Sequence, residues 1–287
     1  MNTKTFRSIE QIVQGIPTTD GAGVRLTRVL TQDLQKRLDP FLMMDAFRSD
    51  DPDDYIAGFP NHPHRGFETI TYMLAGQMQH LDSGGNEGLL GPGDVQWMIA
   101  GSGLIHSELP RQKDGLMEGF QIWLNLPAKD KMIDPAYRDI AANEIPTVTT
   151  EQDVHIKIIA GQSQGQEGAM QRPVTDPLIL DIHLPAGTSF EQVLGDRATA
   201  FLYVYQGQAV IQGQTVPTHH MGILSQTPDA DVRIEAESAT RLLLIAGQPL
   251  EESIAQYGPF VMNTTAQLEQ TLLDYQQGRL VQPVARF

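Results

Sequence analysis

Short runs of β-branched and aromatic residues, each closed by a glycine or proline turn, dominate the first half of this chain. Residues 69–74 form such a run, and residues 77–81 form the next one after a glycine. Residues 95–99 and 120–126 repeat the pattern, again with turns between them. No helical period runs through this region. Short strands at close spacing are typical of an antiparallel sandwich or barrel, so the chain is predicted to be all-β.

The second half repeats the outline of the first. Residues 200–210 look like the strand–glycine–strand unit of residues 69–78, and residues 241–247 stand about where residues 121–126 stood. With 287 residues, the chain is long enough for two cores of ordinary size. A weak internal repeat of about half the chain therefore predicts two barrels of one kind.

The predicted domain division lies between residues 1–140 and residues 141–287. Residues 127–146 change in character, with charged residues and prolines, and are interpreted as the link between the domains. The tail departs from the β pattern, because residues 264–277 carry apolar side chains at helical spacing and Gly278 follows as a C-terminal cap. One C-terminal helix, packed on the second barrel, is predicted.

Two segments of the first half carry candidate metal ligands at positions i and i+2. His62 and His64 form one pair, and His106 and Glu108 form the other. Successive side chains of a strand point to opposite faces, so positions i and i+2 share a face. Same-face neighbours on a helix are three or four residues apart, so a helix cannot converge these pairs. Two strands can bring all three imidazoles and the carboxylate to one point.

Isolated pairs of this kind also occur by chance, as loop or surface residues, but two pairs in one strand-rich half support each other. The chain has no cysteine, which removes thiolate ligands and disfavours a closed structural zinc site. Imidazole and carboxylate ligands suit Fe(II), Mn, Ni, Cu or Zn, and the order of affinities does not choose among these metals. Because Pro63 cannot donate to a sheet, its segment is predicted at a sheet edge or barrel mouth.

Other polar residues give weaker signals. Glu68 lies four residues after His64 and shares its face if the strand is unbroken, as a fifth ligand, an acceptor beside a ligand or a plain surface carboxylate. His80 and Asp82 form another i, i+2 pair, which is interpreted as polar residues at a hairpin end. The corresponding places in the second half carry no histidine, so the second barrel is predicted to lack a metal site.

The charge of the chain limits its partners. The net charge is −15 and the isoelectric point is near 4.8, which argues against direct binding of nucleic acid. No apolar stretch approaches the length of a membrane helix, and the N-terminal residues lack the apolar segment of a secretory signal. Together with the absence of cysteine, these features predict a cytoplasmic protein that does not contact a membrane.

Several motifs occur together in one order along the first half. They are Asp39-Pro40-Phe41, residues 62–69, Asp82-Ser83, residues 92–98, residues 101–108 and residues 121–127. In this combination the chain resembles the pirin family of the cupin superfamily, tightly over residues 37–140 and more loosely to the end. One departure is Leu109, where the family more often has methionine, and it leaves the candidate ligands untouched.

The resemblance implies two tandem cupin (jelly-roll) β-barrels with one mononuclear iron in the N-terminal barrel. Carried over by position, the ligands are His62, His64, His106 and Glu108, the same four that the strand spacing selects. Bacterial members resemble flavonol dioxygenases that open quercetin with dioxygen and release carbon monoxide. Nuclear members are described as iron-dependent, redox-sensitive transcription cofactors.

The leading functional prediction is a metal-dependent dioxygenase, similar to quercetin 2,3-dioxygenase, that acts on quercetin-like flavonols with Fe(II) as the favoured metal. Glu108 is the candidate acceptor for the proton of the substrate enol. Gln121, Trp97 and Trp123 are candidates for the pocket lining, with core packing favoured for both tryptophans. The alternative is an iron-dependent, redox-sensing regulatory protein that acts through protein partners. A third possibility is a structural double cupin that needs no metal.

Overall fold

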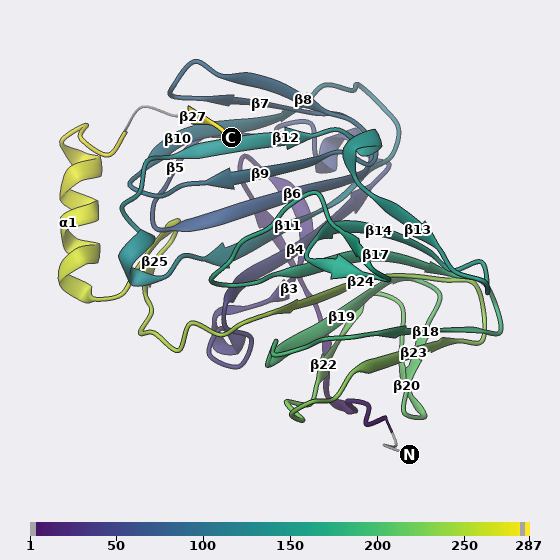
Figure 1. Ribbon diagram of the computed structural model, residues 1–287. Coiled ribbons are helices and arrows are strands. Elements are labelled where there is room, and N and C mark those ends of the chain that lie inside the picture. Colours follow the sequence, from purple (N-terminus) through teal and green to yellow (C-terminus); the bar gives the residue numbers. More distant parts are fainter. Residues whose placement is uncertain (1–3, 282–284) are drawn as a thin grey trace. The chain divides into compact units, whose positions relative to one another are not determined.

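A computed structural model of the chain describes residues 4–281 and 285–287. The described residues form β-strands and a C-terminal helix (Figure 1), which confirms the predicted all-β class. The chain divides into two compact units. The first comprises Ile16–Gln35, Phe41–Ala142 and Leu250–Phe287, and it holds both histidine segments. The second comprises Met1–Gly15, Lys36–Pro40 and Asn143–Pro249.

The histidine-bearing unit has two main sheets. Its described residues form an eight-stranded sheet in the order β2 (Ile16–Asp20), β3 (Val24–Leu30), β4 (Phe41–Ser49), β11 (Met117–Asn125), β6 (Phe67–Ala75), β9 (Val95–Ile99), β12 (Ala136–Ile140) and β27 (Ala285–Arg286). They also form a four-stranded sheet, β5 (Phe59–His64), β10 (Leu104–Pro110), β7 (Met78–Asp82) and β8 (Glu87–Leu90), and a hairpin of β25 (Ala255–Tyr257) and β26 (Phe260–Met262). Strand β4 is a dense apolar run with neighbouring strands on both sides, and residues on both of its faces are buried.

The second unit follows the same plan. Its described residues form a seven-stranded sheet in the order β1 (Ile9–Gln14), β22 (His220–Leu224), β19 (Thr199–Gln206), β24 (Thr240–Gly247), β17 (Leu178–Leu184), β14 (His155–Ala160) and β13 (Thr147–Thr149). A four-stranded sheet follows the order β18 (Thr188–Gln192), β23 (Val232–Ala236), β20 (Ala209–Ile211) and β21 (Gln214–Val216), and β15 (Gln162–Ser163) pairs with β16 (Gln166–Glu167). Alternate residues of β17, including Leu178, Leu180 and Ile182, point into one buried apolar core, as the period of a strand requires.

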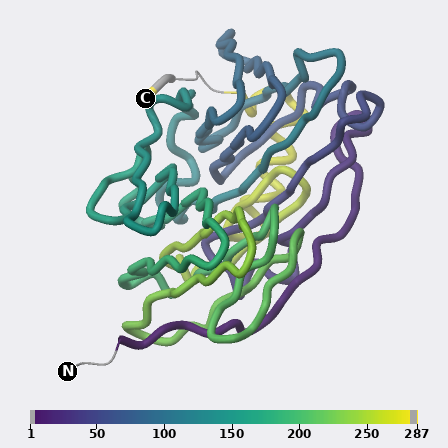
Figure 2. The backbone as a smooth tube through the Cα atoms, turned by 90° about the vertical axis from the view of Figure 1, so that its right-hand side faces the viewer, coloured from purple at the N-terminus to yellow at the C-terminus, as the bar shows by residue number. Residues whose placement is uncertain are grey.

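The two ends of the chain depart from the predicted division between residues 140 and 141. Strand β1, in the N-terminal segment, pairs antiparallel with β22 of the second unit. In Figure 2 this purple segment runs along the light-green strands. The last segment, Leu250–Phe287, belongs to the histidine-bearing unit instead. Residues 127–146 are more than a link, because β12 pairs with β9 along its whole length and buries Tyr137 and Ile140.

The predicted C-terminal helix is α1 (Thr265–Gln276), and it packs in the histidine-bearing unit. Thr264 and Gln267 form a capping box at its start, and Gly278 takes a positive φ of 68° just after its end. Arg65, the residue after His64, donates from Nη1 to Asp274 Oδ2 on the helix at 2.9 Å. The helix is thereby tied to the strand that carries the first histidine pair.

Short 3-10 turns occupy four of the connections between described elements. They are Gln32–Leu34, Pro52–Asp54, Ala128–Asp130 and Ala142–Glu144. Within residues 4–281 and 285–287, no helix combines the length and the apolar character that a membrane crossing requires.

Candidate metal centre and its pocket

Strands β5 and β10 bring the two histidine segments together. They pair antiparallel, with His106 opposite His62. Strand β5 is the edge strand of its sheet, which is the place that Pro63 predicts. A shift in register follows between His106 and Glu108, so Glu108 stands opposite Phe59 of β5, while it keeps a regular register with His80 of β7.

Three imidazoles converge from these two strands. The ring centroids of His62 and His106 are 4.4 Å apart, those of His62 and His64 are 4.7 Å apart, and those of His64 and His106 are 5.0 Å apart. One candidate ligand atom from each histidine lies within 4.8 Å of the other two. His64 and His106 are buried, whereas His62 is partly exposed.

The ring nitrogens of this cluster fit a metal ion. His64 Nδ1 and His106 Nε2 are buried and have no hydrogen-bond partner among the described residues. Leaving a buried polar atom unpaired costs about 1–3 kcal/mol, so such atoms normally have a partner. His62 Nδ1 lies 2.8 Å from the carbonyl oxygen of Pro60, which leaves its Nε2 for another contact. Three available nitrogen donors in one place suit a divalent transition metal.

The electrostatics of the cluster favour neutral imidazoles, the form that binds metals. Burial lowers the pKa of His64 well below its usual value, and the neighbouring His62 lowers it further. Burial likewise lowers the pKa of His106, and His62 and His64 add to the effect. Both buried rings therefore keep a lone pair at neutral pH.

Glu108, the predicted fourth ligand, lies beside this cluster. The group of ligand atoms within 4.8 Å of one another contains the three histidines and not Glu108. Its Oε1 is 3.2 Å from Thr71 Oγ1, which in turn is 2.6 Å from Gln121 Oε1. Burial raises the pKa of Glu108, while His62 and the Thr71 hydrogen bond oppose that rise. Ligation by Glu108 stays a prediction.

The weaker candidates from the sequence take other partners. Glu68 accepts a hydrogen bond from Trp97 Nε1 and does not join the histidine group. Gly66 has a φ of 89° between β5 and β6, which breaks the alternation that the prediction for Glu68 assumed. His80 Nε2 lies 2.9 Å from Asp139 Oδ2, inside the barrel instead of at an exposed hairpin end.

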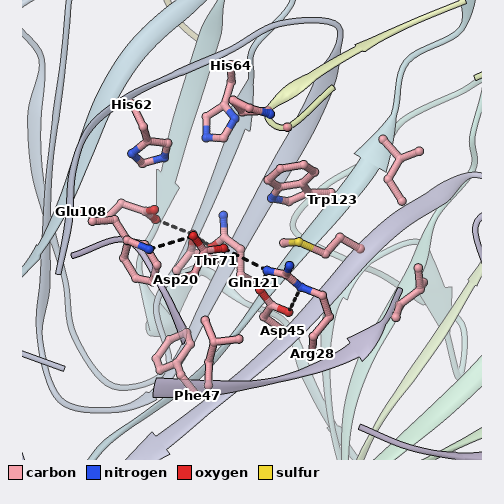
Figure 3. A pocket seen from close by; sticks show the side chains of 18 of the residues that line it. Asp20, Arg28, Asp45, Phe47, His62, His64, Thr71, Glu108, Gln121 and Trp123 are labelled. Atoms are coloured by element: carbon pink, nitrogen blue, oxygen red, sulfur yellow. Dashed lines mark hydrogen bonds and ion pairs between the residues drawn. The ribbon is translucent and has the colours of Figure 1, made fainter. Parts of the chain in front are cut away.

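A cavity of about 620 Å³ adjoins the cluster, and His62, His64 and Glu108 contribute to its wall (Figure 3). Most of its lining is apolar: Leu26, Leu30, Leu42, Met43, Phe47, Phe59, Met78 and Trp123. Gln121 lines it, as the sequence suggested. Trp123 lines it too, although core packing was the favoured prediction for both tryptophans, whereas Trp97 is fully buried elsewhere. A cavity of this volume and character can enclose an aromatic molecule of drug size.

A row of polar side chains crosses the floor of this cavity, and it was not predicted from the sequence. Arg28, Asp45, Gln121 and Thr71 stand opposite one another in register across β3, β4, β11 and β6. We call these four residues the polar row. In Figure 3 the histidines lie on one side of the pocket and the Arg28–Asp45 pair on the other, with Thr71 and Gln121 between them.

Arg28 and Asp45 form the charged end of the polar row. The Arg28 guanidinium donates to both Asp45 carboxylate oxygens, at 2.9 and 2.8 Å, and to Asp20 at 2.9 Å. Burial raises the pKa of Asp45, and the Arg28 pair opposes that rise. Asp45 had one sequence signal, because it is an acidic residue in the middle of the apolar run that forms β4.

Comparison with known proteins shows which family has this sequence and architecture. The family model described as Pirin matches residues 23–124, and the model described as the Pirin C-terminal cupin domain matches residues 179–281. A Pseudomonas aeruginosa protein, provisionally named a quercetin 2,3-dioxygenase, is 48% identical over 282 residues, which cover 96% of this chain and 98% of the relative. The chain belongs to the pirin family.

Other relatives also match this chain over nearly its whole length. A pirin-like protein of Caulobacter vibrioides is 47% identical over 274 residues, which cover 95% of this chain and 99% of that protein. The crystal structure of quercetin 2,3-dioxygenase from Acinetobacter baumannii is 32% identical and superposes with a TM-score of 0.90, over 97% of this chain and 99% of that one. The predicted tandem cupin fold is confirmed.

Proposed function

We propose that this pirin is a metal-dependent dioxygenase that cleaves quercetin-like flavonols with dioxygen. The observation that carries the proposal is the buried three-histidine cluster with unpartnered ring nitrogens beside a large apolar cavity. Relatives that bear the name quercetin 2,3-dioxygenase, one of them a solved structure with the same fold, support it.

In this proposal His62, His64 and His106 hold one divalent metal, with Fe(II) favoured and Mn, Ni, Cu or Zn as the other candidates. Glu108 completes the set or stands beside it. The cavity wall contains three carboxylates, those of Asp20, Asp45 and Glu108, and one guanidinium, that of Arg28. The carboxylates outnumber the guanidinium, and this balance of charge suits a divalent cation. When bound, the metal would polarise the 3-hydroxyl of a flavonol and lower its pKa.

The residues of the chain then have separate tasks. Glu108 would accept the proton that leaves the 3-hydroxyl, since it is a carboxylate in the cavity wall next to the cluster. The apolar side chains, including Phe47, Phe59 and Trp123, would hold the flat aromatic rings and keep water away from the reacting carbon atoms. The neutral imidazoles anchor the metal and leave proton transfer to Glu108.

Replacing His62 with alanine is expected to remove most of the bound metal and, with it, flavonol cleavage. Metal content is measured on the purified protein, and activity is followed as the oxygen-dependent loss of quercetin absorption after anaerobic binding. His155→Ala, an exposed histidine in the second unit, is the control and should keep both properties. A metal-loaded wild-type protein that leaves a panel of flavonols and dioxygen unchanged would refute the proposed function.

A further inference from the structure

Thr71 Oγ1 has two close oxygen neighbours, and these limit which groups can donate the hydrogen bonds. Thr71 is buried on β6, and its Oγ1 lies 3.2 Å from Glu108 Oε1 and 2.6 Å from Gln121 Oε1. A threonine hydroxyl has one hydrogen to donate, and the two neighbouring atoms, a carboxylate oxygen and an amide oxygen, are both acceptors. One neighbour must therefore donate to Thr71.

The Gln121 amide meets this condition without any change at Glu108. A rotation of the amide by 180° about the last side-chain bond places Nε2 where Oε1 stands and leaves the shape of the group unchanged. Gln121 then donates to Thr71 Oγ1, and the single Thr71 hydrogen goes to Glu108 Oε1. Each of the two contacts then has one donor and one acceptor, and Glu108 can stay a carboxylate.

We propose that Thr71 is a positioning residue for Glu108, with Gln121 fixing the direction of the Thr71 hydroxyl. The hydrogen bond occupies Oε1 and leaves Oε2 free of it, in the wall of the cavity that His62 and His64 also line. Oε2 has no partner among the described residues, although Glu108 lies in the cavity wall. Oε1 is thus held by Thr71 of β6, and Oε2 is available to the metal and to the substrate proton.

The sheet fixes the backbone of Glu108 but not the end of its long side chain. A register shift between His106 and Glu108 places Glu108 opposite Phe59 of β5, whereas its register with β7 is regular, opposite His80. No lysine or arginine forms an ion pair with Glu108 among the described residues, and Thr71 provides its hydrogen bond. Thr71 is held by its register opposite Gln121, in a sheet whose central strands are buried.

The same strand offers a matched control. Thr69 lies two residues before Thr71 on the same face of β6 and is equally buried. Its Oγ1 has no hydrogen-bond partner among the described residues. Thr69→Val and Thr71→Val therefore remove the same group from similar surroundings, and only the second removes a hydrogen bond to Glu108.

The test uses Co(II) as a probe of the centre, because its visible absorption changes with the number and arrangement of its ligands. Co(II) spectra and affinities are measured for wild type, Thr71→Val, Thr71→Ser, Thr69→Val and Glu108→Gln. The Thr71→Val spectrum is expected to move from that of wild type toward that of Glu108→Gln, with Co(II) affinity or flavonol turnover lower by about 10–100-fold. Thr71→Ser should restore the wild-type values, and Thr69→Val should match them.

A Thr71→Val protein with the wild-type spectrum and affinity would overturn the proposal. So would an equal change in Thr69→Val, which would indicate a general packing effect, or a failure of serine to restore the spectrum. The turnover arm rests on the proposed function, but the Co(II) spectra do not. If wild type cleaves no flavonol, the proposed reaction is wrong while the spectra still decide the role of Thr71.

Discussion

Glu108→Gln is expected to slow flavonol turnover on the order of 10²–10⁴-fold, the usual range for the loss of a general base, while the metal stays bound. Glutamine has the shape of glutamate and can still accept the hydrogen bond that Thr71 gives to Oε1. Its amide cannot take up a proton from the substrate hydroxyl. The three imidazoles, which supply the nitrogen donors, are unchanged.

Turnover and metal content are measured on the same preparations, so that a loss of metal is not mistaken for a loss of the base. Glu269→Gln, which removes an exposed carboxylate from the surface of α1, is the matched control and should behave as wild type. A Glu108→Gln protein that keeps its metal and its full turnover would show that another group accepts the proton.

The histidine cluster could be predicted because strand geometry alone relates its members. His62 and His64 share a face of β5, and His106 comes from the adjacent strand β10, so two local patterns and one pairing suffice. The orientation of Glu68 could not be predicted in this way. Its position depends on Gly66, whose positive φ interrupts the strand, and the sequence pattern alone did not reveal the break.

The polar row was beyond local patterns for a different reason. Its members come from four strands that are far apart in the chain, and they meet only through the register of the sheet. Register is set by the packing of the whole barrel, and a slip of one residue would turn each side chain to the other face. The role of Thr71 beside Glu108 therefore emerges only from the three-dimensional structure.

For the two ends of the chain, local patterns likewise did not show the unit in which each end packs. A helix over residues 264–277 was predicted from its apolar spacing and from Gly278 as its C-terminal cap. The structure has the helix at residues 265–276 with Gly278 in place, and it adds a capping box at the start that was not predicted. The unit in which it packs was not encoded in that pattern. Its partner is set by contacts such as Arg65 with Asp274. Strand β1 likewise finds its partner through pairing with β22 and through Ile9 and Ile12, which join the apolar core of the second unit.

Lys131 joins the turn between β5 and β6 to the rest of its unit from a fully buried position. It is 1% exposed, and its Nζ donates to Gly66 O at 2.8 Å, to Asn125 Oδ1 at 2.7 Å and to Val261 O at 3.0 Å. Lys131→Met keeps the apolar stem but leaves three acceptors without a donor. We expect the free energy of unfolding to fall by at least about 3 kcal/mol, since each of the three buried unpaired acceptors costs about 1–3 kcal/mol.

The stability is also expected to depend on pH through Lys131. Burial lowers its pKa to about 7, against the opposing charge of Glu252, whereas a lysine in the unfolded chain keeps its ordinary value of 10.5. Between these two values the unfolded chain binds more protons, so the free energy of unfolding of wild type should rise with pH. Lys131→Met lacks this titration, and its deficit relative to wild type should widen as the pH increases above 7.

Urea unfolding of wild type and Lys131→Met on either side of neutral pH measures both effects, and the difference between the proteins cancels titrations that they share. Lys129→Met, an exposed lysine two residues away, is the control and should change stability by no more than about 0.5 kcal/mol. A Lys131→Met protein as stable as this control would mean that the three oxygens find other donors. A deficit that stays constant with pH would mean that Lys131 keeps its proton in the folded state, because its three acceptors outweigh the cost of burying the charge.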